Sequence, residues 1–420
     1  MSHKAGERNE RRSCPAKKFV HILSSKGTML FVETQDIKPG MRLAKPVYNR
    51  NGVLLFDRNT KLTVQNIVNL TNFGLIGIFI LEPAEPLPPI SKEEQEFEQL
   101  QTFYMFRLRD SLVNISKGKM PTDLPGLAKD VTDHFGTLDH KVHFTQTIRS
   151  NTDFVYKHSV GVAIISAMIG HAMGLRESTL LSIVNAAFLY DFGYLYVPAE
   201  IMKKGEDITE IENSTITKYR EKAFALLHAD TNPYSIPSDS LAMVTQMIRA
   251  GRAEGDVVDR SKWLTGTSIL TVADKFDRMT AMSLSRKPNS EISAIRYLID
   301  HPESYPKNIV SALAKCIHIM PVGCCVDLTN GDKGLVLETN ERDFNQPVVL
   351  CFRDNQILDL SSPKINKTIR IADVMHTMDN RVKMDAETLK QFTTDENSSK
   401  MVKKYQFKKL QIEKKLQRQA

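Results

Sequence analysis

Short apolar runs mark the first part of the chain after its polar N-terminus. Residues 29–33, 53–56 and 76–81 are runs of strand length, and turn-forming Pro-Gly and Asn-Gly pairs lie between them. Residues 63–72 differ, because their apolar positions fall near one face of a helix. This combination predicts a small α/β domain over residues 29–82.

Helical patterns dominate the middle of the chain. Prolines concentrate in residues 82–89, which predicts a semi-rigid spacer because proline fixes φ. A mostly helical connector follows, so that spacer and connector together cover residues 83–150. Two strongly apolar segments, residues 153–173 and 177–189, then begin a helical core that we expect over residues 151–319.

Strand-type runs return after Pro321. They cover residues 326–329, 334–338 and 347–352 and predict a small β appendage over residues 320–375. The expected fold class is therefore mainly α, with a helical bundle core between a small N-terminal α/β domain and a small C-terminal β appendage.

Both ends of the chain are polar and basic. Residues 1–28 show little periodic hydrophobicity and predict a flexible basic arm. Residues 376–420 predict a charged, basic tail, in which eight lysines and arginines against one glutamate, all from Lys400 onward, account for the formal net charge of +7. This tail has no continuous apolar face, so we favour a solvated helix over a handle for nucleic acid or an anionic surface.

Cysteine usage and hydropathy indicate the compartment. The five cysteines form no C-x-x-C pair, which is not a disulfide framework. The N-terminus lacks the apolar region of a secretory signal. The longest apolar stretch, residues 160–175, is shorter than the ~20 residues that a membrane span needs. We expect a cytoplasmic protein without a transmembrane segment.

Three ionisable residues of the helical core have side chains that bind metals. His158 lies near the start of a long apolar helix, Asp191 follows the next helix, and Asp274 lies within a later one. Imidazole and carboxylate groups are common metal ligands, but such residues beside apolar helices are more often structural. Their spacing alone therefore does not favour a metal site.

The segments around these residues carry a second signal. The runs from Tyr156 to Ala163, from Ala187 to Tyr194 and from Val272 to Asp277, with flanking similarity at residues 37–44, 321–331 and 347–349, together resemble the HD-GYP family of phosphohydrolases. The resemblance implies an HD-type helical bundle whose two or three metal ions, usually iron or manganese, activate a hydroxide that attacks cyclic di-GMP. His158 matches the first histidine of that family, Asp191 the aspartate of its His-Asp pair, and Asp274 its late aspartate.

The chain departs from the family at other ligand positions. Tyr190 stands where the His-Asp pair has histidine, Tyr194 where a lysine follows the glycine, and Tyr219 where the next histidine is expected. Residues 245–255 lack the His-His pair and the Gly-Tyr-Pro signature. We interpret Tyr190 and Tyr219 as aromatics that fill the space of lost imidazoles and metal.

Three further residues are considered as possible parts of the site. Arg286 matches a basic position that contacts substrate phosphate in the family, so it is a candidate phosphate-binding residue. His171 and His228 are the histidines near enough in sequence to compensate for the lost ligands, and we expect neither to do so.

The reduced ligand set decides the functional prediction. Two cations about 3.5–4 Å apart repel each other and need a dense shell of ligands, so we expect none or one weakly bound divalent metal and assign no catalytic residue. We predict a catalytically impaired HD-GYP-like module of bacterial cyclic di-GMP signalling that acts through signalling proteins or residual cyclic di-GMP binding, and we lean against an enzyme. The alternative is an active cyclic di-GMP phosphodiesterase with a reduced or rearranged iron or manganese site.

Overall fold

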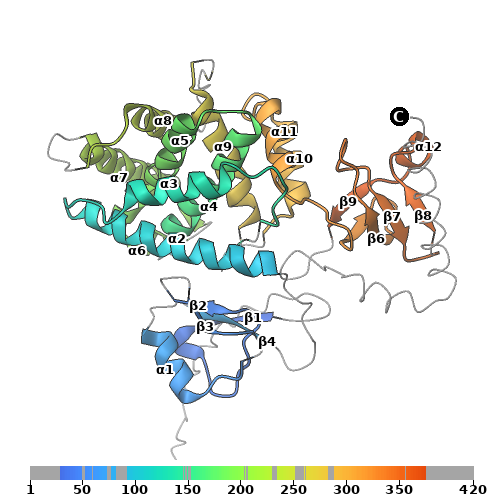
Figure 1. Ribbon diagram of the computed structural model, residues 1–420, viewed down its shortest axis with the longest axis horizontal. Helices are drawn as coiled ribbons and strands as arrows, with labels where there is room; N and C mark the ends of the chain where they lie inside the picture. The colour runs from blue at the N-terminus through green and yellow to red at the C-terminus, as the bar shows by residue number, and fades with distance from the viewer. Residues whose placement is uncertain are drawn as a thin grey trace, which may run out of the picture.

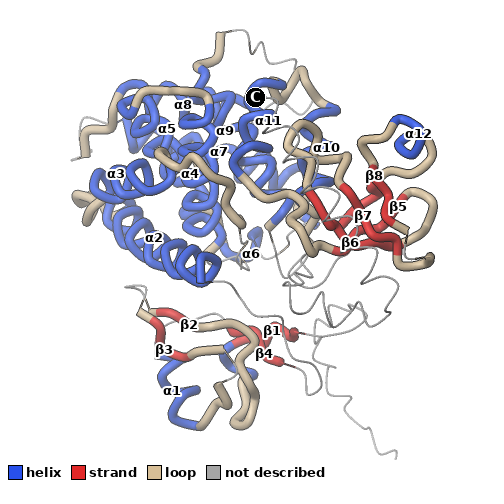
Figure 2. Tube along the Cα trace, turned by 45° about the vertical axis from the view of Figure 1, so that its right-hand side comes forward, coloured by secondary structure: helices blue, strands red, loops and turns tan. Residues whose placement is uncertain are grey.

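The computed structural model describes residues 29–49, 53–58, 60–72, 77–81, 92–144, 146, 149, 153–202, 204, 207–228, 234–250, 260, 262–281, 288–354 and 356–374. The predicted basic arm, proline-rich spacer and basic tail lie outside these residues. A helical body forms the centre, with a small α/β unit beside α2 and a β-sheet beside α10 (Figures 1 and 2). The predicted fold class, mainly α with an N-terminal α/β part and a C-terminal β part, is confirmed.

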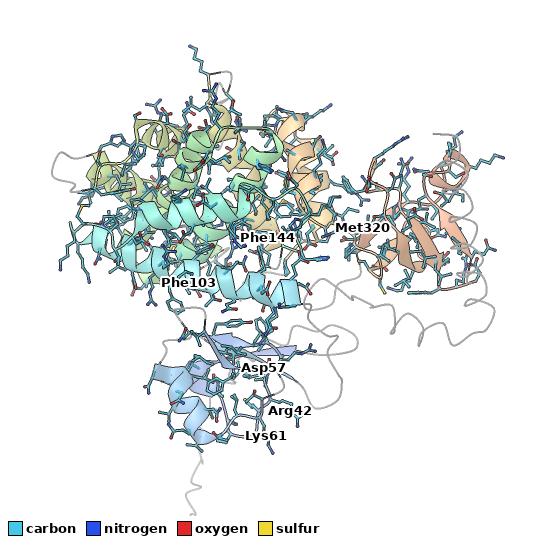
Figure 3. The ribbon with its side chains drawn as sticks, viewed as in Figure 1. Arg42, Asp57, Lys61, Phe103, Phe144 and Met320 are labelled. Carbon is cyan, nitrogen blue, oxygen red and sulfur yellow. The ribbon has the colours of Figure 1, made fainter. Side chains whose placement is uncertain are left out.

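The N-terminal unit is built from two antiparallel strand pairs and one helix. Strand β1 (Met29–Glu33) pairs with β4 (Gly77–Leu81), β2 (Val47–Tyr48) pairs with β3 (Leu54–Phe56), and helix α1 (Val64–Asn72) packs beside them, with the 3-10 turn η1 (Thr34–Asp36) between. Leu43, Leu62 and Leu70 are fully or almost fully buried in its core. Arg42 and Lys61 lie side by side in an isolated antiparallel bridge (Figure 3).

The helical body surrounds one central helix. Its elements are α2 (Lys92–Ser116), α3 (Leu124–Phe135), α4 (Phe154–Ala172), α5 (Glu177–Leu189), η2 (Phe192–Tyr196), α6 (Ala199–Met202), α7 (Glu210–His228), α8 (Ser238–Ala250), α9 (Thr265–Thr280), α10 (Glu291–Asp300) and α11 (Lys307–Cys316). Helix α4 is buried on all sides and packs against α2, α5, α9 and α11. Its sequence is apolar all round rather than amphipathic, which suits a central position.

The connection from α3 to α4 differs from the prediction. We expected a mostly helical pattern to residue 148, but α3 ends at Phe135, and Val142 then forms a parallel bridge with Ile317. Phe144, 2% exposed, anchors this connection in the helical body (Figure 3). Backbone pairing with a distant segment, which local periodicity does not report, overrides helical propensity here.

A five-stranded antiparallel sheet follows the last helix of the body. Its strands are β5 (Cys325–Leu328), β6 (Lys333–Glu338), β7 (Val348–Cys351), β8 (Ile357–Asp359) and β9 (Ile371–Val374), in the order β8-β7-β6-β5-β9, with the short helix α12 (Pro363–Asn366) beside them. Arg296 of α10 donates to the carbonyl oxygens of Ala372 at 2.6 Å and Ile371 at 2.7 Å. These hydrogen bonds connect the sheet to the helical body.

Within the described part of the chain, no helix is both long enough and apolar enough to span a membrane.

Candidate functional site

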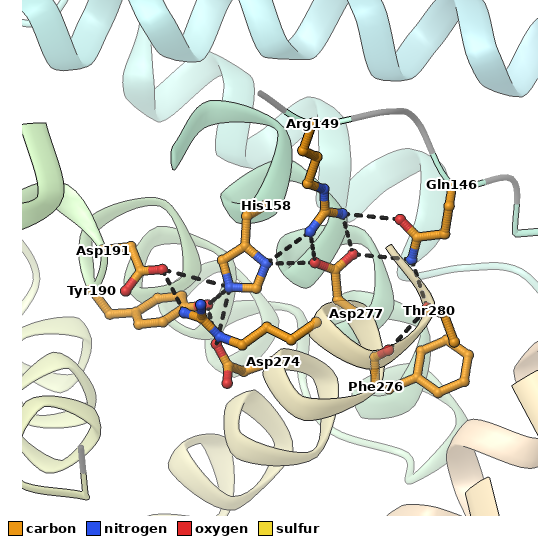
Figure 4. A network of polar contacts seen from close by, with 10 residues as sticks. Gln146, Arg149, His158, Tyr190, Asp191, Asp274, Phe276, Asp277 and Thr280 are labelled. Carbon is orange, nitrogen blue, oxygen red and sulfur yellow. Dashed lines mark hydrogen bonds and ion pairs between the residues drawn. The ribbon is translucent and has the colours of Figure 1, made fainter. Parts of the chain in front are cut away.

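The fold brings together the three residues that the sequence singled out as metal ligands. His158 comes from α4, Asp191 from the turn after α5, and Asp274 from α9, and one ligand atom from each lies within 4.8 Å of the others. His158 Nε2 is 3.0 Å from Asp274 Oδ1 and 3.5 Å from Asp191 Oδ2. Figure 4 shows the three side chains close together; those of His158 and Asp191 are fully buried, whereas that of Asp274 is 19% exposed. A metal-binding role for this triad stays a prediction.

Asp277, one helical turn after Asp274, orients the imidazole. Its Oδ2 is hydrogen-bonded to His158 Nδ1. Burial alone would raise the pKa of Asp277, but Arg149 and His158 outweigh burial and lower the pKa to about 2. The ionised carboxylate therefore accepts the Nδ1–H of His158, which leaves Nε2 facing the other two carboxylates. Histidines that bind metals are oriented in the same way.

Arg149 holds Asp277 through a buried ion pair. The side chains of Arg149 and Asp277 are 4% and 0% exposed, and both guanidinium Nη atoms donate to the carboxylate, Nη2 at 2.6 Å. Gln146 adds a hydrogen bond from Nε2 to Asp277 Oδ1 at 3.2 Å and accepts one from Arg149 Nη2 at 3.0 Å (Figure 4). This pair ties the chain before α4 to α9.

A glycine makes room for this carboxylate. Gly161 lies one turn after His158 on the same face of α4, and a Cβ atom there would be 2.5 Å from Asp277 Oδ1. Arg149 Nη2 would lie 3.4 Å from the same Cβ atom. A larger residue would therefore push against an ion pair that cannot move freely.

Tyr190 contributes a neutral hydroxyl to the cluster. Its oxygen is 2.7 Å from His158 Nε2 and 2.7 Å from Asp274 Oδ1, and the residue is 2% exposed. Burial, followed by the charges of Asp274 and Asp191, raises the pKa of Tyr190 well above its usual value of 10.0. The phenol stays protonated at neutral pH, so it donates a hydrogen bond and does not act as an anionic ligand.

Two arginines that the sequence analysis missed contact the candidate ligands. Arg278 donates from Nε to Asp274 Oδ1 at 2.9 Å and from Nη2 to Asp191 Oδ2 at 2.9 Å. Arg220, from α7, donates from Nη2 to Asp191 Oδ1 at 3.2 Å. Burial would raise the pKa of Asp274, but Arg278 and His158 hold it well below its usual range. The i,i+4 spacing of Asp274 and Arg278 was the signal available in the sequence.

Aromatic rings cover these guanidinium groups. Arg278 lies 5.3 Å from the ring centroid of Phe154, whose ring stacks on His158 at 5.1 Å. Arg220 lies 4.9 Å from the ring centroid of Tyr194. Guanidinium groups over aromatic faces gain a cation–π attraction. Tyr194 thus contacts a cation rather than one of the candidate ligands.

The other predicted residues lie apart from the triad or outside the described residues. Tyr219 directly precedes Arg220 in α7, and of these two residues it is Arg220 that donates a hydrogen bond to Asp191. His171 Nε2 is 2.9 Å from Asp139 Oδ1, and exposed His228 packs on Phe224 at the end of α7. Arg286 and residues 251–255 lie outside the described residues, so the phosphate-binding prediction stays a prediction.

The charges of the cluster decide which metal centre it suits. Three donors within 4.8 Å form a candidate site for a single divalent cation. However, the two negative charges of Asp191 and Asp274 are already balanced by the two positive charges of Arg220 and Arg278. Two added divalent cations would leave a large uncompensated charge in a mostly buried place. The described residues of this cluster therefore do not suit a dinuclear centre.

Comparisons with known proteins agree with this architecture. The family model for the HD domain matches residues 142–307. Cyclic di-GMP phosphodiesterase PdeB of Borreliella burgdorferi is 22% identical over 204 residues, which cover 48% of this chain and 53% of that protein. Cyclic di-GMP phosphodiesterase PA4108 of Pseudomonas aeruginosa is 24% identical over 233 residues, which cover 54% of this chain and 55% of that protein. The chain thus spans about half the length of the curated relatives it matches.

A solved structure was also matched. Bd1817, an HDG"Y"P protein from Bdellovibrio bacteriovorus, aligns with a TM-score of 0.39 and 11% identity, covering 68% of this chain and 98% of that one.

Proposed function

Residues 142–307 match the family model for the HD domain, and from this premise we propose that the chain is a catalytically impaired regulatory or binding module. In this proposal it acts in cyclic di-GMP-type signalling, through protein partners or through residual binding of the nucleotide. Cyclic di-GMP enters the proposal because the two curated relatives are named phosphodiesterases of that compound.

The observation that supports the proposal is the composition of the donor set. Among the described residues, the group that could hold a metal ion consists of one imidazole and two carboxylates. The hydroxyl of Tyr190 lies at 2.7 Å from both His158 and Asp274, and as a neutral phenol it supplies no negative charge. Two metal ions at a shared hydroxide require more anionic and imidazole ligands than these. Attack on a phosphodiester through such a pair is therefore not expected.

A second candidate function rests on the orientation of His158. Asp277 directs His158 Nε2 toward Asp191 and Asp274, which is the arrangement that a single divalent cation would use. An enzyme with a reduced or rearranged site, using one iron or manganese ion, would retain this feature. When bound, such an ion would supply Lewis-acid chemistry, and His158, Asp191 and Asp274 would hold it.

Metal analysis and a turnover assay separate the two functions. The full chain, purified and then incubated with manganese or ferrous iron, is analysed for bound metal and for linear product from cyclic di-GMP. Asp191→Ala, which removes a candidate ligand, is the matched control for contaminating activity. We expect wild type and Asp191→Ala to give the same background rate. Linear product from the wild type but not from Asp191→Ala, with either one or two bound ions per chain, would overturn the proposal.

Residual nucleotide binding has its own experiment. Cyclic di-GMP is titrated into wild type, Arg286→Ala and Lys287→Ala, which removes a neighbouring charge of the same sign. If Arg286 contacts phosphate, its loss weakens binding by about 10-fold or more, because hydrogen bonds to charged groups contribute about 1.5–3 kcal/mol. Equal effects of the two substitutions would indicate a general charge effect and remove Arg286 from the proposal.

A further inference from the structure

Arg278 occupies the place of a bridging cation between two carboxylates from different helices. Its Nε reaches Asp274 and its Nη2 reaches Asp191, each at 2.9 Å. These are the two carboxylates that, with His158, form the candidate metal-binding group. A single guanidinium thus connects two groups that a metal ion would otherwise connect, because its planar fork presents several N–H donors in one direction.

Arg220 completes the charge balance. It donates to Asp191 Oδ1, the oxygen that Arg278 does not use. The two guanidinium groups together carry the charge of one divalent cation, and each contributes directed hydrogen bonds to the carboxylates. Neither arginine can dissociate into solvent, unlike a metal ion.

The cross-links join elements that are distant along the chain. Asp191 and Arg278 are 87 residues apart, and Asp191 and Arg220 are 29 residues apart. Through them the turn after α5, helix α7 and helix α9 meet at one point. Gly193 permits the approach of α7, because a Cβ atom at that position would collide with the backbone of Arg220. This close packing places the guanidinium of Arg220 beside Asp191.

We propose that Arg278, assisted by Arg220, is a built-in replacement for the metal ion, which makes the helical body independent of metals for its stability. The proposal adds that removal of Arg278 converts His158, Asp191 and Asp274 into a site for one divalent cation. It rests on the proposed function, since a chain that required metal for catalysis would gain nothing from guanidinium groups on its ligands.

The experiment compares the thermal stability and the manganese binding of three full-length proteins. They are wild type, Arg278→Ala and Arg107→Ala, each measured in EDTA and in excess manganese chloride. Arg107 is the matched control, because its guanidinium also pairs with two carboxylates, those of Asp123 and Asp130, but between α2 and α3. Binding of Mn²⁺ is followed by isothermal titration calorimetry.

We expect the Tm of the wild type to be the same in both solutions. Arg278→Ala should lose about 2–5 °C in EDTA, because the fully buried carboxylate of Asp191 has lost one of its two guanidinium partners, although the side chain of Arg278 is itself 32% exposed. Manganese should restore at least half of this loss and bind at one ion per chain, since a ligand that binds only the folded state stabilises it. Arg107→Ala should show no recovery with manganese.

Several results would overturn the inference. They are a wild type that loses stability in EDTA, an Arg278→Ala protein as stable as wild type, and equal manganese recovery in both variants. If Arg278→Ala does not fold, the inference is tested by the Tm of the wild type in EDTA and in manganese chloride. It is also tested by Arg278→Lys, which keeps the positive charge and should bind no manganese. Failure here is distinct from failure of the proposed function, which is judged by turnover of cyclic di-GMP.

Discussion

Breaking the buried ion pair of Arg149 and Asp277 should strongly destabilise the helical body. We consider Asp277→Ala, which leaves a guanidinium that is 4% exposed without its carboxylate. The same substitution takes the acceptor away from His158 Nδ1. Because both partners are almost fully removed from water, solvent cannot take over these roles.

The expected magnitude follows from this burial. Removing one partner of a buried pair costs about 3–5 kcal/mol, because the other charge stays behind uncompensated. Replacing both partners by apolar residues, as in Arg149→Met with Asp277→Ala, should cost clearly less than the sum of the two single substitutions Arg149→Met and Asp277→Ala. We expect a coupling free energy of about 2–3 kcal/mol between the two positions.

The pair should also give the protein a characteristic acid dependence. The pKa of Asp277 is about 2 in the folded protein, whereas an unfolded aspartate has a pKa near ~3.9. A folded-state pKa below the unfolded value means that this stability is complete above the unfolded pKa. This contribution to stability is lost as the pH falls from the unfolded-state pKa toward the folded-state pKa. The contribution is roughly 2 kcal/mol, lost between about pH 4 and pH 2.

Urea unfolding monitored by tryptophan fluorescence measures both effects. The chain has one tryptophan, Trp263, which lies just before α9 and therefore reports on the helix that carries Asp277. Free energies of unfolding are compared at pH 7 for wild type, the two single variants and the double variant, and then followed toward pH 2. Additive single substitutions, or an Asp277→Ala protein with the acid dependence of wild type, would refute the reasoning.

Three further predictions concern other contacts. Gly161→Ala should lower the free energy of unfolding by about 1–3 kcal/mol, because the clash with Asp277 outweighs the ~1 kcal/mol that alanine gains in helix propensity. Urea titration measures this free energy, and a variant more stable than wild type would contradict the prediction. Tyr190→Phe should cost about 1.5–3 kcal/mol through the lost hydrogen bond to Asp274, also measured in urea, and no loss would show that the hydroxyl is dispensable. Arg296→Ala should speed amide exchange in the C-terminal sheet, whereas equal acceleration in α4 would indicate global unfolding instead.

The sequence alone determined the fold class and the main helices. The segments predicted at residues 153–173 and 177–189 form α4 (Phe154–Ala172) and α5 (Glu177–Leu189), because periodicity and apolar content are local properties that a short segment carries with it. The same segments carry the resemblance to HD-GYP proteins, and the family model for the HD domain matches residues 142–307. The resemblance also selected His158, Asp191 and Asp274, whose spacing alone did not favour a site.

Only the tertiary structure decided what surrounds those three residues. Arginine is usually an exposed residue, and apart from the i,i+4 spacing of Asp274 and Arg278, nothing local distinguishes Arg149, Arg220 and Arg278 from the other basic residues of the chain. Their partners lie 128, 29 and 87 residues away, so the contacts exist only after α4, α5, α7 and α9 have packed together. Ion pairing in a buried cluster depends on distance and dielectric environment in three dimensions, which a one-dimensional pattern does not contain.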